Sequence, residues 1–161
     1  MMPTRVPPTA GAGRAAADRV VVVDDDDATV ALMTDLLTRA GVSDVHGVTD
    51  PREALRVIHE VDADLVVLDL TMPHVDGYEV LARLRDGEGA GVFRPVLVMT
   101  GDGSPAARAR ALALEATDVL VKPVPMRQTI HHVLELLRAR HAARADHAVG
   151  SRTPAPRPAR A

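Results

Sequence analysis

Four short runs of apolar, mostly β-branched residues constrain the fold of this chain most tightly. They are Val20–Val23, Leu65–Leu68, Val96–Met99 and Val119–Val121. Continuous apolar runs of this length are typical of strands that are buried on both faces, as in a parallel sheet covered by helices. A weaker run over Val45–Val48 predicts a fifth strand at an edge of that sheet.

Helical patterns lie between the predicted strands. Each places apolar residues three or four positions apart, and Asp50-Pro51 and Ser104-Pro105 are cap and first-turn signals. The expected helices cover residues 28–40, 51–61, 77–85, 105–115 and a last stripe from Met126 to Leu137. Strands and helices therefore alternate, and right-handed crossovers predict an α/β fold, a (βα)5 doubly wound parallel sheet of five strands with helices on both faces.

The length of 161 residues fits one ordinary domain with extensions at both ends. Residues 1–18 are interrupted by prolines and lack the apolar core of a secretory signal, so we expect a flexible leader. The domain itself is expected over residues 19–143. Residues 144–161 are rich in Ala, Arg and Pro and are predicted to form a disordered tail.

Charge and composition exclude several classes of function. Residues 19–137 carry a net charge of −9, so the domain lacks the basic stripe of a nucleic-acid-binding protein, and only the basic tail could contact nucleic acid. Aromatic residues make up 1% of the chain, too few for a base-stacking platform. The absence of cysteine excludes disulfides and thiolate metal sites and fits a cytoplasmic protein. No apolar run approaches the roughly 20 residues of a membrane helix, so membrane insertion is not expected.

Polar residues follow the predicted strands at the edge where such sheets bind ligands. Asp24 and Asp25 follow the first strand, Asp69 the third, Thr100 the fourth and Lys122 the fifth. Ligands of open parallel α/β sheets bind outside the carboxyl ends of the strands, at the point where the strand order reverses. We therefore expect three carboxylates, one hydroxyl and one amine to converge there.

Three carboxylates that lie close together repel one another unless a cation neutralises them, and oxygen ligands of this kind suit Mg²⁺. An aspartate beside such a metal can act as a nucleophile and form an acyl phosphate. Lys122 and Thr100 would then bind the phosphoryl oxygens. Lys122 is the only lysine of the chain, against 18 arginines, which indicates a position that favours a compact ammonium group.

These residues resemble the response-regulator receiver domains of two-component signalling. The segment ending in Asp24-Asp25 is similar to the first strand and acidic pair of that family, and Asp69 is followed by Met72-Pro73, as its phosphorylated aspartate is. Thr100-Gly101 resembles the family's switch threonine and the small residue after it. Asp76-Gly77 matches the turn into the third helix, and Lys122-Pro123 resembles the Lys-Pro pair. The resemblance covers about residues 19–137.

The resemblance implies a flavodoxin-like strand order of 2-1-3-4-5 and a regulatory function rather than an enzyme. It implies that Asp69 accepts a phosphoryl group from a histidine kinase, a phosphotransfer protein or a small donor, and that Thr100 and Lys122 hold that group. It further implies Mg²⁺ ligation by Asp25, Asp69 and the backbone carbonyl of Thr71, with Asp24 helping through water. A downstream partner would bind the face made by the fourth helix, fifth strand and fifth helix. The resemblance also implies a cis peptide at Lys122-Pro123 and a tuning of dephosphorylation by Thr71 and Asp102.

One departure from the family keeps a second interpretation open. The family often has an aromatic ring three residues before the lysine, and Val119 occupies that position here. The chain could therefore be a constitutive interaction module whose output is independent of phosphorylation. A hydrolase of the haloacid-dehalogenase type is disfavoured, because that class has a second aspartate two residues after the nucleophile and this chain has Thr71 there.

Overall fold

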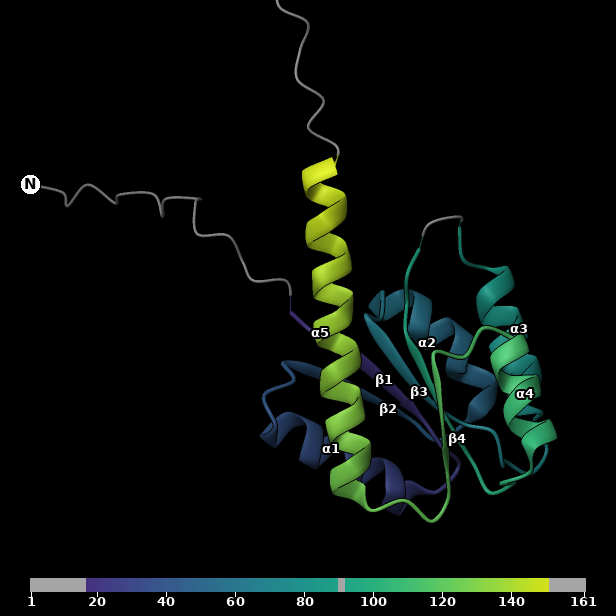
Figure 1. Ribbon diagram of the computed structural model, residues 1–161. Helices are drawn as coiled ribbons and strands as arrows, with labels where there is room; N and C mark the ends of the chain where they lie inside the picture. The colour runs from purple at the N-terminus through teal and green to yellow at the C-terminus, as the bar shows by residue number, and fades with distance from the viewer. Residues whose placement is uncertain (1–16, 90–91, 151–161) are drawn as a thin grey trace, which may run out of the picture.

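The computed structural model describes residues 17–89 and 92–150, and in this part of the chain five strands alternate with five α-helices (Figure 1). The strands are β1 (Arg19–Val23), β2 (Asp44–Val48), β3 (Leu65–Asp69), β4 (Val96–Thr100) and β5 (Asp118–Val121). The helices are α1 (Asp27–Arg39), α2 (Ala54–Val61), α3 (Gly77–Asp86), α4 (Pro105–Ala113) and α5 (Met126–Gly150), and a short 3₁₀ turn, η1 (Pro51–Glu53), precedes α2.

The strands form one parallel sheet in the order β2-β1-β3-β4-β5. Helices α1 and α5 cover one face of the sheet, and α2, α3 and α4 cover the other (Figure 1). The prediction of a doubly wound flavodoxin-like sheet is therefore confirmed. Because β1 lies between β2 and β3, the strand order reverses beside β1, and the carboxyl ends of β1 and β3 are neighbours.

Two apolar cores, one on each face, explain why the strand sequences are continuously apolar. On β1, Val21 and Val23 pack in the same core as Ile58 of α2. The alternate residues Val20 and Val22 pack in the other core, with residues of α1 and α5. Successive side chains of a strand point to opposite faces, so a strand covered on both sides needs an apolar residue at every position.

Helix α5 differs from the prediction, because it continues to Gly150 and passes the domain boundary expected at residue 143. Alanine and arginine, which dominate this stretch, both favour helix. In addition, Arg140 Nε and Arg144 Nη1 lie 3.2 and 3.3 Å from Oδ1 of the buried Asp64, just before β3. The first part of the predicted tail is thus an ordered helix. The remainder, residues 151–161, lies outside the described residues, as do residues 1–16 of the predicted leader.

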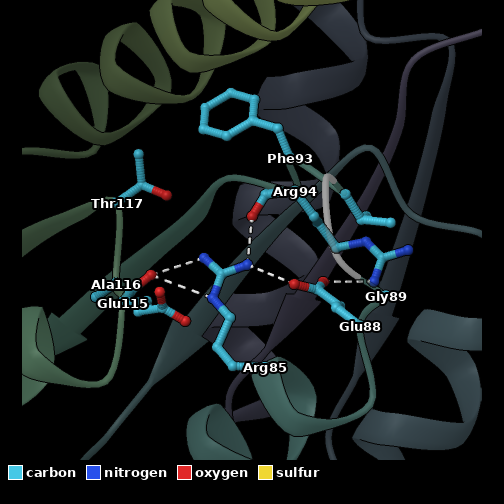
Figure 2. Close-up of a pocket in the computed structure, with 9 residues that line it drawn as sticks. Arg85, Glu88, Gly89, Phe93, Arg94, Glu115, Ala116 and Thr117 are labelled. Atoms are coloured by element: carbon cyan, nitrogen blue, oxygen red, sulfur yellow. Dashed lines mark hydrogen bonds and ion pairs between the residues drawn. The ribbon is translucent and has the colours of Figure 1, made fainter.

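A polar network holds the amino edge of the sheet beside a pocket of about 520 Å³ (Figure 2). Arg94 pairs with Glu88 at 2.7 Å and donates to the carbonyl oxygen of Ala63 at 2.6 Å. Arg85 pairs with the same Glu88 at 2.8 Å and donates from Nη2 to the carbonyl oxygen of Glu115 at 2.7 Å (Figure 2). The network therefore joins α3 to the segments that precede β3, β4 and β5, at the edge opposite Asp69.

None of the helices within residues 17–89 and 92–150 combines the length and the apolarity that a bilayer crossing requires.

Candidate functional site

The three predicted carboxylates lie together at the carboxyl edge of the sheet. Asp24 and Asp25 directly follow β1, and Asp69 is the last residue of the neighbouring β3. One carboxylate oxygen from each of the three lies within 4.8 Å of the others. Asp24 and Asp69 are buried, whereas Asp25 is exposed. The cluster is therefore open to solvent on the side of Asp25.

Lys122, which follows β5, reaches into this cluster. Its Nζ lies 2.9 Å from Oδ2 of Asp69 and 3.6 Å from Oδ2 of Asp24. Its backbone N–H donates to the carbonyl oxygen of Thr100 at 2.8 Å, which extends the pairing of β4 with β5 to the lysine. The peptide bond between Lys122 and Pro123 is cis, as predicted. The amine thus comes to the same place as the carboxylates.

The ionisation of the site reflects its surplus of negative charge. Burial raises the pKa of Asp24, and the nearby charges of Asp69 and Asp25 raise it further, against the opposing effects of a hydrogen bond from the Asp26 N–H and of Lys122. Burial alone would lower the pKa of Lys122, but the hydrogen bond and charge of Asp69, together with Asp24, outweigh it and raise that pKa. Lys122 is therefore a cation at neutral pH. One ammonium faces three carboxylates, and this oxygen-rich donor set fits a hard divalent cation.

Thr100 ends β4 at the same edge, and its side chain is buried. Its hydroxyl accepts a hydrogen bond from the Asp102 N–H at 3.0 Å, so it bonds within its own loop rather than to the carboxylates. Asp102 in turn accepts from the Ser104 N–H at 2.8 Å. The predicted hydroxyl is thus at the same edge of the sheet as the carboxylates, bonded to the start of the loop that leads to α4.

The loop after β3 shapes the remaining side of the site. The Thr71 N–H donates to Oδ1 of Asp69 at 2.9 Å, so both oxygens of Asp69 have a donor. The Thr71 hydroxyl accepts from the Gly101 N–H at 3.0 Å, which joins this loop to the loop after β4. Sequence reasoning missed this second contact, since nothing in the spacing of the two residues signals it.

Gly77 also has a role that its turn signal did not reveal. A Cβ atom at this position would lie 2.6 Å from Cα of Leu70 and 3.0 Å from the carbonyl oxygen of Asp69. The first turn of α3 can therefore approach the end of β3 only because residue 77 has no side chain.

Val119 is buried in the core that α2, α3 and α4 cover. Its side chain belongs to that packing, and no ring stands at this position on β5.

Comparison with known proteins agrees with this architecture. The family model described as "Response regulator receiver domain" matches residues 20–134. The transcriptional regulatory protein TcrA of Mycobacterium tuberculosis is 39% identical over 116 residues, which cover 72% of this chain and 44% of TcrA. The alkaline phosphatase synthesis transcriptional regulatory protein PhoP of Bacillus subtilis is 33% identical over 120 residues, or 74% of this chain and 48% of PhoP. The chain spans less than half the length of these two relatives.

Solved structures show the same likeness. The chemotaxis protein CheY4 of Vibrio cholerae superposes with a TM-score of 0.68 at 28% identity and covers 75% of this chain and 99% of its own. The receiver domain of a Francisella response regulator also superposes with a TM-score of 0.68, at 27% identity, over 76% of this chain and 98% of its own. The family match, the relatives and the strand order agree, and the chain belongs to the response-regulator receiver domains of two-component systems.

Proposed function

We propose that this protein is a phosphorylation-controlled switch in which Asp69 accepts a phosphoryl group from a histidine kinase, a phosphotransfer protein or a small phosphodonor. The observation that supports this most strongly is the setting of the Asp69 carboxylate. One oxygen lies 2.9 Å from Lys122 Nζ, the other accepts from the Thr71 N–H at 2.9 Å, and two further carboxylates stand within 4.8 Å.

In the proposed reaction a carboxylate oxygen of Asp69 attacks the phosphorus of the donor. The new O–P bond forms as the bond from phosphorus to its leaving group breaks; with acetyl phosphate the leaving group is acetate. Lys122 neutralises charge on the phosphoryl oxygens, and Thr100 turns its hydroxyl from the Asp102 N–H toward them. The protein is a stoichiometric acceptor in this scheme, with Thr71 and Asp102 tuning the later hydrolysis.

Mg²⁺ fits the donor set, and we assign its binding to the carboxylates of Asp25 and Asp69 and the backbone carbonyl of Thr71, with Asp24 acting through water. The surplus of carboxylates over ammonium groups and the raised pKa of Asp24 both favour a bound cation. When bound, the metal supplies charge neutralisation for the incoming phosphoryl group.

The proposed output surface is the face formed by α4, β5 and α5. Thr100 connects the site to this face, because it immediately precedes the loop that leads to α4 and pairs with β5. Leu112 of α4 and Val121 of β5 are both 42% exposed, which gives these two elements apolar side chains for a protein partner.

The decisive experiment is intact-protein mass spectrometry after incubation with acetyl phosphate. The wild type should gain one phosphoryl group with Mg²⁺ and none with EDTA, and Asp69→Ala should gain none under either condition. Asp86→Ala is the matched control, because Asp86 is an exposed aspartate at the end of α3, outside the cluster. Uptake that persists in Asp69→Ala would contradict the assignment.

One observation favours a second function, a constitutive interaction module with the same fold. Val119 fills core space where the family often has a ring, so phosphorylation has no aromatic rotamer at that position to shift. This alternative predicts that the beryllofluoride complex with Mg²⁺ leaves the amide resonances of residues 100–125 unchanged. The proposed switch predicts shifts throughout α4 and β5.

A further inference from the structure

The hydrogen bond between Thr71 and Gly101 ties together the two loops that flank the proposed phosphoryl site. The Gly101 N–H donates to the Thr71 hydroxyl at 3.0 Å. Thr71 belongs to the loop after β3, and Gly101 is the first residue after β4. The last backbone bond between these strands, from the Leu70 N–H to the Met99 carbonyl oxygen at 2.8 Å, lies just before it. The hydroxyl thus continues the pairing of the two strands by one further step.

Thr71 also bonds to Asp69 directly. Its N–H bonds to Oδ1 of Asp69, while its hydroxyl occupies the Gly101 N–H. The Gly101 N–H therefore points toward the loop that carries the acceptor, and its donor capacity is used by a neutral hydroxyl.

A phosphoryl group on Asp69 would bring three strong acceptor oxygens into this space. Charged acceptors bind a backbone N–H more strongly than a neutral hydroxyl does. Three donor groups lie on this side of the site. Lys122 Nζ already bonds to Asp69, the carboxylate that would carry the phosphoryl group, and the Thr100 hydroxyl can still donate its own hydrogen, whereas the single hydrogen of the Gly101 N–H is used by the Thr71 hydroxyl.

We infer that the Thr71 hydroxyl is a latch on the resting state: it holds the Gly101 N–H, and a phosphoryl group must break this bond to recruit that donor. Thr71 is then a positioning residue that sets how tightly the site holds phosphoryl. The inference rests on the proposed acceptance of phosphoryl by Asp69.

A competing hydroxyl and a merely structural hydroxyl predict opposite changes in phosphoryl binding when the Thr71 hydroxyl is removed. If the hydroxyl only kept the loop after β4 in place, its removal would loosen that loop and weaken phosphoryl binding. If it competes for the Gly101 N–H, its removal frees a donor and tightens binding. Valine preserves the shape of threonine without the acceptor, and serine preserves the acceptor.

The test is a titration with beryllofluoride and Mg²⁺, followed by the amide resonances of the protein, for wild type, Thr71→Val, Thr71→Ser and Thr38→Val. Thr38 lies on α1, and its exposed hydroxyl bonds to the carbonyl oxygen of Thr34, so it controls for the substitution itself. We expect Thr71→Val to bind beryllofluoride roughly two- to tenfold more tightly than the wild type does, which is the change in affinity that one net hydrogen bond produces. Thr71→Ser and Thr38→Val should bind like the wild type.

A second readout needs no phosphoryl analogue. In the metal-free protein, hydrogen exchange of the Gly101 amide should accelerate in Thr71→Val and stay slow in Thr71→Ser. Equal or weaker beryllofluoride binding by Thr71→Val would overturn the inference alone, as would an unchanged Gly101 exchange rate. Failure of all four proteins to bind would overturn the proposed function, and the inference with it.

Discussion

Lys122 Nζ lies 2.9 Å from Oδ2 of Asp69, although 53 positions separate the two residues in the chain. The parallel sheet brings them together, because β3 and β5 flank β4 and all three strands end at the same edge. The ammonium group of Lys122 therefore occupies one oxygen of the Asp69 carboxylate, and a metal ion bound at this cluster would lie close to that positive charge.

Replacing this lysine should separate metal binding from phosphoryl uptake. We expect Lys122→Met to bind Mg²⁺ about tenfold more tightly at pH 8, equivalent to about 1.4 kcal/mol, because a like charge next to the metal is removed. Phosphoryl uptake from acetyl phosphate should fall in the same variant. Calorimetric titration with MgCl₂ measures the first effect, and Arg127→Met, which removes an exposed charge from α5, is the control. Weaker Mg²⁺ binding by Lys122→Met would contradict this account.

The raised pKa of Asp24 predicts how stability depends on pH in metal-free buffer. Its pKa is raised in the folded protein above the ordinary value of 3.8, so the ionised form is better accommodated in the unfolded chain. The stability contributed by this group is therefore complete below pH 3.8 and is lost as the pH rises through the folded pKa.

The substitution Asp24→Asn removes the loss of stability that comes with ionisation of Asp24, and it keeps an oxygen that accepts from the Asp26 N–H. We expect its Tm at pH 7 to exceed that of the wild type by about 4 °C, the shift that roughly 1 kcal/mol produces in a domain of this size. The gain should shrink as the pH is lowered through the raised pKa of Asp24. Thermal unfolding followed by circular dichroism in EDTA tests this, with Asp86→Asn as the control. A lower Tm at pH 7 would show that the pairing of Asp24 with Lys122 outweighs its burial.

Removal of the carboxylate that anchors α5, Asp64, should be strongly destabilising. Asp64 is buried, and its carboxylate lies within 3.5 Å of Arg19, Arg140 and Arg144. Asp64→Asn leaves the buried Arg140 without a counter-charge, which typically costs about 3–5 kcal/mol.

Urea unfolding measures this loss. Asp62→Asn is the matched control, because Asp62 lies on the surface with two ion pairs at 3.5 Å, and asparagine tolerates its left-handed backbone. The control should change the free energy of unfolding by less than about 1 kcal/mol. Equal effects from the two substitutions would argue against the anchor.

Gly77 should not accept a side chain. The Cβ of Gly77→Ala would press on the backbone of Leu70 and Asp69, and relief of such a clash usually costs about 1–3 kcal/mol. Gly89→Ala is the comparison, since a Cβ there has nothing within 4 Å. The difference between the two variants in urea midpoint measures the clash, and a tolerated Gly77→Ala would mean that α3 can shift away from β3.

The fold was predictable because its core imposes a simple pattern on the sequence. Strands covered on both faces need continuous apolar runs, and β1 and β3 show them over Val20–Val23 and Leu65–Leu68. The same geometry made the carboxylate cluster predictable, since parallel strands end at one edge and the residues after them must meet. Asp24, Asp69 and Lys122 could be placed together on that basis alone.

Other features depend on contacts that the local pattern does not record. The apolar stripe of α5 ends before the helix does. The later part of the helix is held by the bond from Arg140 to Asp64, and these two residues are 76 positions apart in the chain. The bond from Gly101 to Thr71 links residues 30 positions apart through a single hydroxyl. Such polar contacts carry no periodicity, so the three-dimensional structure is needed to find them.

The extension of α5 has a mechanical consequence. The helix begins at the carboxyl edge of the sheet and runs past the amino edge (Figure 1), where Arg140 forms an ion pair with Asp64. Asp64 directly precedes β3 and Asp69 ends it, so this strand connects the ion pair of Asp64 with Arg140 to the carboxylate cluster. The ten residues after Arg140 span about 15 Å along the helix axis. A tilt of the helix by about 5° at Arg140 would therefore displace Gly150 by roughly 1.3 Å. A small tilt of α5 about its contact with Asp64 is thus amplified at Gly150, and that contact adjoins the strand that ends in Asp69.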